Sequence, residues 1–387
     1  MTLPKHIAAG LLISLLTACT SIDEVKTRPP ADMAGGTSAQ TAWPAGMDEK
    51  QTRTRIARLF PAGVKDKTAW AGDLYAAFLH LQIPHTPQSY CAVMAVIEQE
   101  SSFQADPVVP GLPEIVWREL EQRGAKYGIP KLLISAAMLK TSPDGRSYQK
   151  RIDALKTEKQ LNTLYNEMIS ELPFGQKLFA DYNPVRTGGP MQVSIEFAEQ
   201  QSQEKPYPYP LTGNIRDEVF TRRGGIYFGS AILLDYPAPY NDVVYRFADF
   251  NAGRYSSRNA AFQMALSRLA GKPLVLDGDL LRYEKGLASD TPSSVETAAR
   301  SIAGQLQMTP NEIRRDLLLE KTPAFNQSPL FKRVFSQTDK ATGTILTRQA
   351  MPQIDLKSPK ITRKLTTEWF ARRVEGRYKS CLSRNDA

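Results

Sequence analysis

The sequence predicts a mainly α-helical protein, and three observations support that class. From about Asp48 onward, apolar residues recur at steps of three and four, which gives a helix one apolar face. Several segments begin with residues that cap helices. No stretch alternates apolar and polar residues for long enough to predict a substantial sheet.

Two of the expected helices are the clearest. An apolar stripe marks the first, and its members are Trp70, Leu74, Phe78 and Leu81. Thr86 is suited to cap the second, with Pro87 at the first helical position and an end near Glu100.

The same periodicity continues along the chain. Further helices are expected over residues 114–126, 131–140, 147–172, 192–203, 217–234, 242–250 and 257–270. Capping-box patterns, Ser293 with Glu296 and Thr309 with Glu312, open two more. A final helix is expected from near Pro359, and its apolar positions are Leu365, Phe370, Val374 and Tyr378.

The first 18 residues have the features of a signal peptide. Lys5 and His6 precede an apolar run at 7–16, which is too short to span a bilayer. The sequence Leu-Thr-Ala-Cys at 16–19 resembles a lipobox, which implies cleavage before Cys19 and lipidation of its thiol. Thr20 is not the aspartate that retains lipoproteins in the inner membrane, so we expect an outer-membrane anchor facing the periplasm. The alternative is an ordinary secretory signal with a chance cysteine.

Composition narrows the function classes. The chain has a net charge of +9, and loss of Lys5 with the signal leaves +8 on 369 residues. The excess is spread out, which fits an anionic polymer or a membrane surface, and a periplasmic protein is not expected to bind nucleic acid. Residues 19–47 are expected to be the lipidated Cys19 followed by a flexible tether, because the proline- and glycine-containing segments after it show little periodicity.

Histidine is scarce, and this argues against several chemistries. The mature chain has only His80 and His85, with no HExxH and no CxxC pattern. We therefore expect no metal and no other cofactor.

The segment around Glu100 is the strongest candidate for catalysis. At 100° per residue, Glu100 lies beside the apolar stripe that includes Val93 and Ile97. Partial desolvation there would raise the pKa of its carboxyl group and suit a general acid. Glu98 is the rival carboxylate, and the structural alternative is that Glu100 only ends and solvates a core helix.

Three short motifs, in order, resemble those of the lytic transglycosylases, enzymes with a goose-lysozyme-like fold. They are Gln-Glu-Ser-Ser-Phe at 99–103, Gly-Pro-Met-Gln-Val at 189–193 and Ala-Asp-Phe-Asn-Ala-Gly at 248–253. The resemblance covers residues 86–270 discontinuously, about half of the chain. The chain also resembles an uncharacterised family of proteobacterial lipoproteins.

The resemblance implies cleavage of peptidoglycan glycan strands between N-acetylmuramic acid and N-acetylglucosamine. Glu100 would protonate the glycosidic oxygen and then act as the base that closes a 1,6-anhydro ring. The implied substrate-binding residues are Ser101, Met191, Gln192, Phe250 and Asn251.

Two departures from the family's pattern leave a second function open. Almost ninety residues separate Ser101 from Gly189, where the family has roughly twenty, and Phe250 replaces a tyrosine. The expected organisation is a lysozyme-like domain at 48–270 with a helical insertion at about 104–187, followed by a helical extension at 271–387. The alternative function is a non-catalytic peptidoglycan-binding or envelope scaffold lipoprotein that retains this fold.

The cysteines predict one disulfide. Lipidation would consume Cys19 and leave Cys91 and Cys381 as an even pair in an oxidising compartment. The alternative is two separate buried cysteines that act as small apolar residues.

Overall fold

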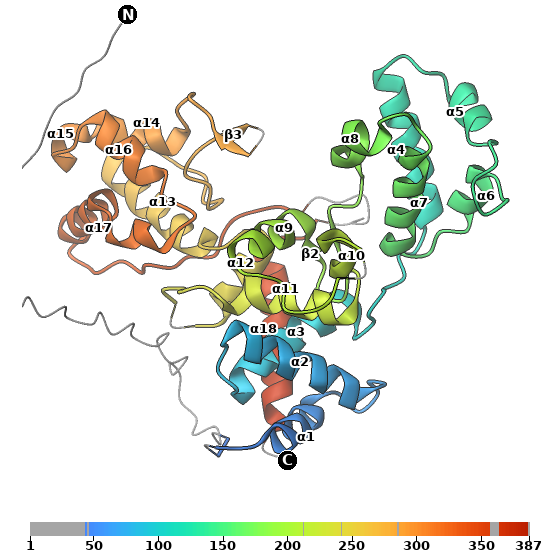
Figure 1. The fold of residues 1–387 in the computed structure, drawn as a ribbon. Coiled ribbons are helices and arrows are strands. Elements are labelled where there is room, and N and C mark those ends of the chain that lie inside the picture. The colour runs from blue at the N-terminus through green and yellow to red at the C-terminus, as the bar shows by residue number, and fades with distance from the viewer. Residues whose placement is uncertain are drawn as a thin grey trace, which may run out of the picture. The chain divides into compact units, whose positions relative to one another are not determined.

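The computed structural model describes residues 43–44, 46–211, 213–240, 242–284, 286–356 and 364–385. The expected signal peptide, Cys19, nearly all of the expected tether and Pro359 lie outside these residues. Within them are eighteen α-helices, two short 3-10 helices and four strands of two residues each (Figure 1). The protein is therefore mainly α-helical, as the sequence predicts.

The largest hydrophobic core, called the main core here, draws on both ends of the described chain. Its helices are α1 (Glu49–Leu59), α2 (Lys67–Leu81), α3 (Pro87–Ser101), α9 (Ile195–Glu204), α10 (Ile215–Val219), α11 (Arg222–Leu234), α12 (Val244–Ala252) and α18 (Thr367–Ser383). All four members of the predicted apolar stripe on α2 are buried in it. Thr86 caps α3 as expected, because its side chain accepts a hydrogen bond from the Ser89 amide.

The expected insertion forms a lobe of its own around a small second core, called the insertion lobe here. Its elements are α4 (Leu112–Lys126), α5 (Lys131–Ala137), α6 (Tyr148–Asp153), α7 (Glu158–Ser170), α8 (Gly175–Phe179) and the 3-10 helix η1 (Ala180–Tyr182). One helix was expected over 147–172, but the chain turns between α6 and α7. Thr157 starts α7 with a capping box, and the amide of Val109 bonds the carbonyl of Lys156 in the intervening turn.

The third core belongs to a C-terminal lobe. It contains α13 (Ser256–Ala270), α14 (Ser294–Ser301), α15 (Ala303–Leu306), α16 (Pro310–Leu317), η2 (Pro323–Gln327), α17 (Pro329–Thr342) and the hairpin of β3 (Tyr283–Glu284) with β4 (Leu287–Ala288). The cores therefore divide the chain differently from the expected boundary at 270. Helix α13 contributes Phe262 and Leu266 to the third core, and α18 returns to the main core.

Both predicted capping positions open helices, but one box is incomplete. Thr309 and Glu312 cap α16 reciprocally. Ser293 accepts from the Glu296 amide at the start of α14, whereas the buried Glu296 carboxylate pairs with Arg300 and Arg314. Those ion pairs keep this side chain from reaching back to the cap.

The N-terminal boundary of the folded part lies earlier than expected. Trp43 donates a hydrogen bond of 2.7 Å from Nε1 to Asn385 Oδ1, and its ring lies 5.5 Å from that of Tyr90. The end of the expected tether at 19–47 is thus already held against the main core. Among the described residues, no helix has the length and apolar character needed to cross a bilayer.

Candidate functional site

Glu100 lies at the C-terminal end of α3, where the helix leaves the main core. Every residue from Tyr90 to Ile97 is buried, and Glu98, Gln99 and Glu100 are half-buried. The helix thus carries three polar side chains out of an apolar interior at its last turn.

The turn after Glu100 is held by backbone conformations that are rare for these residue types. Ser102 and Phe103 have φ values of 49° and 60°, in the left-handed region. The Phe103 ring packs edge-on against Phe60 at 5.2 Å and Trp70 at 5.8 Å, which anchors the turn. Ser101, expected to bind substrate, is buried and donates its hydroxyl to the Ile97 carbonyl at 2.9 Å.

The second motif forms a β-hairpin turn instead of opening a helix. Strand β1 (Thr187–Gly188) pairs with β2 (Val193–Ser194), and α9 begins only at Ile195, with Ser194 as its cap. Gln192 adopts a φ of 50° and its side chain bonds Thr187 and the Gly189 carbonyl, so it stabilises the turn.

Met191, a predicted groove residue, is a core residue. It is fully buried, and a Cβ added at Gly229 would lie 2.2 Å from its sulfur. A Cβ at Gly225 would likewise lie 2.5 Å from Pro190. The glycines at 225 and 229 are one turn apart on α11, so they make a smooth face that receives the hairpin turn. This explains the motif as a packing element.

The third motif ends α12 and contains a buried carboxylate that the sequence analysis did not single out. Asp249 is 1% exposed and accepts four hydrogen bonds. The donors are the hydroxyls of Tyr236 (3.1 Å) and Tyr240 (2.6 Å) and the amides of Tyr255 (2.8 Å) and Ser257 (2.7 Å). Burial raises the pKa of Asp249, while these donors act to lower it. The sequence signal for Asp249 was an acidic residue between apolar residues near the end of a helix. Tyr236 and Tyr240, which donate to it, precede it by 13 and 9 positions.

Phe250 and Asn251 are directed at the last helix. The rings of Phe250 and Phe370 are stacked, with centroids 6.5 Å apart. Asn251 Oδ1 accepts a hydrogen bond of 2.8 Å from the hydroxyl of Thr367, a fully buried residue at the start of α18.

The same helix reaches the acidic end of α3. Arg377 of α18 donates to Glu98 Oε1 at 3.3 Å and to Gln99 Oε1 at 3.2 Å. Thr367 and Arg377 are ten residues apart, which corresponds to about 15 Å along a helix. Helix α18 therefore contacts both the first and the third motif, and it packs on both α3 and α12.

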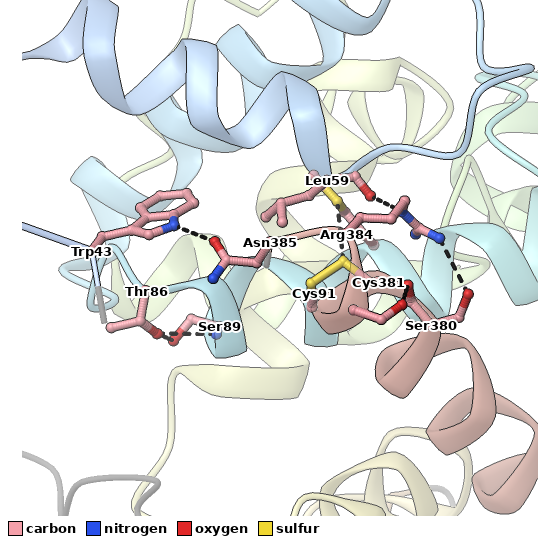
Figure 2. Close-up of a disulfide and its surroundings, with 11 residues drawn as sticks. Trp43, Leu59, Thr86, Ser89, Cys91, Ser380, Cys381, Arg384 and Asn385 are labelled. Carbon is pink, nitrogen blue, oxygen red and sulfur yellow. Dashed lines mark hydrogen bonds between the residues drawn. A yellow bond between two sulfur atoms is a disulfide. The ribbon is translucent and has the colours of Figure 1, made fainter. Parts of the chain in front are cut away.

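The structure contains the disulfide that the sequence predicts. Cys91 and Cys381 are bonded with a Cα–Cα distance of 5.5 Å, within the usual range for a bridge (Figure 2). The bond joins the buried start of α3 to the end of α18. Around it, Arg384 donates to the Leu59 carbonyl at 2.6 Å, which links the end of α18 to α1.

An open pocket runs along the exposed side of α18 next to Glu98. Its lining residues are Glu98, Trp369, Arg372, Arg373, Gly376, Arg377 and Ser380. The Arg373 guanidinium lies over the Trp369 ring at 5.9 Å. The pocket thus combines an aromatic face with cationic donors, and none of its α18 residues was a predicted site residue. Among the described residues, no cluster of histidine, cysteine, aspartate or glutamate has the arrangement of a metal site.

The final helix begins later than the sequence suggested. Thr366 caps it, so Leu365 precedes the helix, while Phe370 and Val374 are buried and Tyr378 is half-buried. The apolar stripe that predicted α18 is thus the face that packs on the main core.

Comparison with known proteins identifies the family of the chain. No solved structure matches it. A protein of Escherichia coli (strain K12), "Uncharacterized protein YaiW", is 47% identical over 349 residues, which is 90% of this chain and 94% of the relative. The model of the family described as "Protein of unknown function (DUF1615)" matches residues 63–384. The chain therefore belongs to the DUF1615 family.

Proposed function

We propose that this protein is an outer-membrane-anchored lipoprotein that faces the periplasm and binds peptidoglycan glycan strands with a lysozyme-like helical core. The observation that carries the proposal is the position of α18, which contacts the first and the third motif. On its exposed side, α18 carries the open pocket that Trp369 and three arginines line. Indole rings stack on sugar faces, and arginines bind carboxylates such as those of the peptide stems.

Binding without cleavage is favoured because the implied groove residues are used inside the protein. Ser101 and Met191 are buried, and the Asn251 oxygen is bonded to Thr367. The disulfide holds α18 in this place. A catalytic groove that ran from Glu100 to Asn251 would need the space that α18 occupies near Asn251.

Cleavage as a lytic transglycosylase is the second candidate, and one observation supports it. Glu100 is half-buried at the last turn of α3, immediately before the left-handed turn at 102–103. Such a position is suited to a carboxyl that gives a proton and takes one back. Glu98 is less suited, because its carboxylate is already held in an ion pair with Arg377 at 3.3 Å.

Sedimentation with purified sacculi tests binding. We expect the mature protein to cosediment, and Arg373→Ala to weaken that binding at least about fivefold, the loss of one charge-assisted contact. Arg282→Ala, at another exposed arginine, is the matched control and is expected to bind normally. Binding that is absent, or equally weakened by both variants, would contradict the proposal.

Product analysis separates the two candidates. Under the binding proposal, digestion of sacculi yields no anhydromuropeptides. If such products appear and Glu100→Gln abolishes them while Glu98→Gln does not, the protein is a lytic transglycosylase and the binding-only proposal is wrong. Metabolic labelling with palmitate tests the anchor, and Cys19→Ala is expected to lose the label.

A further inference from the structure

Exposed apolar side chains are concentrated in one lobe of the protein. Of the seventeen large apolar residues exposed among the described residues, eleven lie in the insertion lobe. The other six are scattered over the main core and the C-terminal lobe. Single exposed apolar residues are ordinary on a soluble protein, but a cluster of this size marks a surface that is covered by something else.

The lobe's own core cannot account for these residues. Its core cluster has five buried members, which are Leu112, Tyr148, Ile152, Leu155 and Leu164. Helix α5 has no buried residue at all, although Leu132 and Leu133 are on it. The apolar content of the lobe is therefore displayed outward more than it is buried.

Contacts within the lobe bring most of the exposed residues to one end, while Phe179 and Tyr182 lie back along α7, where the Tyr165 hydroxyl bonds the Phe179 carbonyl at 2.8 Å. Helices α4 and α7 both start beside the 108–109 and 156–157 pairing, so their C-terminal ends lie far from it. There Lys140 pairs with Glu171, which joins the end of α5 to the end of α7.

We call this end the apolar tip. It consists of Tyr127, Ile129, Leu132, Leu133, Leu139, Leu172, Phe174 and Leu178. Tyr127, Phe174 and Leu132 are 80%, 79% and 78% exposed, so these side chains project from the surface. Projecting aromatic and leucine side chains are suited to insertion among lipid headgroups.

Basic residues surround the tip. Segments 121–140 and 171–182 contain five basic and three acidic residues. Lys131 is paired with Glu121 at 2.7 Å, and Lys140 with Glu171. Within the part of the chain that the structure describes, Lys126 and Lys177 have no acidic partner, and both are exposed. Their ammonium groups are therefore available to lipid phosphates beside the apolar side chains.

We propose that the apolar tip docks into a phospholipid surface that contains anionic headgroups, as a second membrane contact beside the lipid at Cys19. This inference rests on the proposed anchor for its geometry. From Cys19 to Trp43 the chain has 24 residues, which span at most about 86 Å when extended.

A fluorescent probe at the tip tests this in the lipidated protein. Phe174→Cys is labelled with an environment-sensitive dye, with Cys91 and Cys381 protected by their disulfide. Ile345→Cys, at an 87% exposed residue of the C-terminal lobe, is the matched control. On vesicles of phosphatidylethanolamine and phosphatidylglycerol, the tip probe is expected to brighten about threefold or more and to be quenched by spin-labelled lipid. The control probe is expected to stay unchanged.

Substitutions test the same surface without the anchor. Signal-less protein with Cys19→Ala is sedimented with the same vesicles. Tyr127→Ser, Leu132→Ser and Phe174→Ser together are expected to lower vesicle binding at least about tenfold, since each removes apolar area from the contact. Val275→Ser, Leu287→Ser and Ile345→Ser together remove similar exposed residues elsewhere and are expected to leave it unchanged.

The outcomes separate the tip from the anchor and from other partners. Equal responses of the two probes, or equal binding of the two triple variants, would overturn the proposal. A tip probe that is protected without vesicles, in an oligomer seen by sedimentation velocity, would identify a second copy of the chain as the occupant and also overturn it. A missing palmitate label with an intact tip response would contradict the anchor and still support the tip.

Discussion

The hydroxyl of Thr367 donates a hydrogen bond of 2.8 Å to the side-chain oxygen of Asn251, which lies 116 positions earlier in the chain. Asn251 belongs to a motif that would face a glycan in a lytic transglycosylase, yet here its oxygen faces a helix of the same protein. The bond therefore helps to hold α18 against α12.

A double-mutant cycle quantifies that bond. Thr367→Val is nearly isosteric and keeps the backbone bond to Ile354, while Asn251→Ala removes the acceptor. Each is expected to lower the free energy of unfolding by about 1 kcal/mol, with a coupling of about 0.5–1.5 kcal/mol between them. Urea unfolding of the four proteins gives these values, and additive effects would show that the bond contributes nothing.

Removing the disulfide is expected to destabilise the main core. The bond closes a loop of 290 residues, for which the chain-entropy model gives an upper limit of about 5–6 kcal/mol, and measured losses are about 2–5 kcal/mol. The double variant Cys91→Ser with Cys381→Ser should melt at a lower temperature than the oxidised protein. Dithiothreitol should lower the melting temperature of the natural protein and leave that of the double variant unchanged. Equal melting temperatures with and without the bond would contradict the stapling role.

Asp249→Asn tests the buried carboxylate at the end of α12. An amide has one oxygen where the carboxylate has two. The NH₂ group of the substituted side chain would therefore face either the Ser257 amide, which now donates to Oδ1, or the donors that now bind Oδ2, such as the Tyr255 amide. We expect a loss of about 2–4 kcal/mol in the free energy of unfolding. Asp181→Asn, at an exposed aspartate, is the control and should change stability by less than about 0.5 kcal/mol. A mild effect at Asp249 would mean that the four donors are satisfied in another way.

The C-terminal lobe is expected to lose stability as the pH rises toward neutrality. Burial raises the pKa of Glu320 to about 7, with Asp279 also raising it, while the Tyr283 hydroxyl at 2.5 Å, the Leu280 amide and Lys321 act to lower it. The folded lobe thus prefers the protonated carboxyl. Its contribution is full below the ordinary pKa of 4.5, is lost as the pH rises to about 7, and then stays constant.

The size of this effect is about 3 kcal/mol between those two pH values. Glu320→Gln is neutral at every pH, so its urea unfolding should lack that component between pH 5 and 8. Glu284→Gln, at a neighbouring surface carboxylate, should retain it. A Glu320→Gln protein with the natural pH profile would show that another group titrates.

The sequence predicted several elements closely because their signals are local. Thr86 and Pro87 start α3, and Thr309 with Glu312 starts α16, through bonds that span three residues. The stripe on α2 and the stripe on α18 were readable because a helix repeats its faces regularly. The pair Cys91 and Cys381 followed from the expected lipidation of Cys19, which leaves two cysteines.

The left-handed turn at Ser102 and Phe103 was not readable, since neither residue is a glycine and the ring contacts that hold it come from Phe60 and Trp70. The same holds for the hairpin around Met191, which is set by the glycine face of α11. In each case partners distant in the chain decide the local conformation.

By itself, the sequence determined the helical class, most helix starts and the cysteine pairing, because these depend on short-range spacing or composition. Only the tertiary structure decided where the side chains of the three motifs are directed. Burial of Ser101 and Met191, the four bonds to Asp249 and the bond from Thr367 to Asn251 join segments up to 116 residues apart. Such contacts depend on how helices pack, and no spacing along the chain encodes which helix will cover which motif.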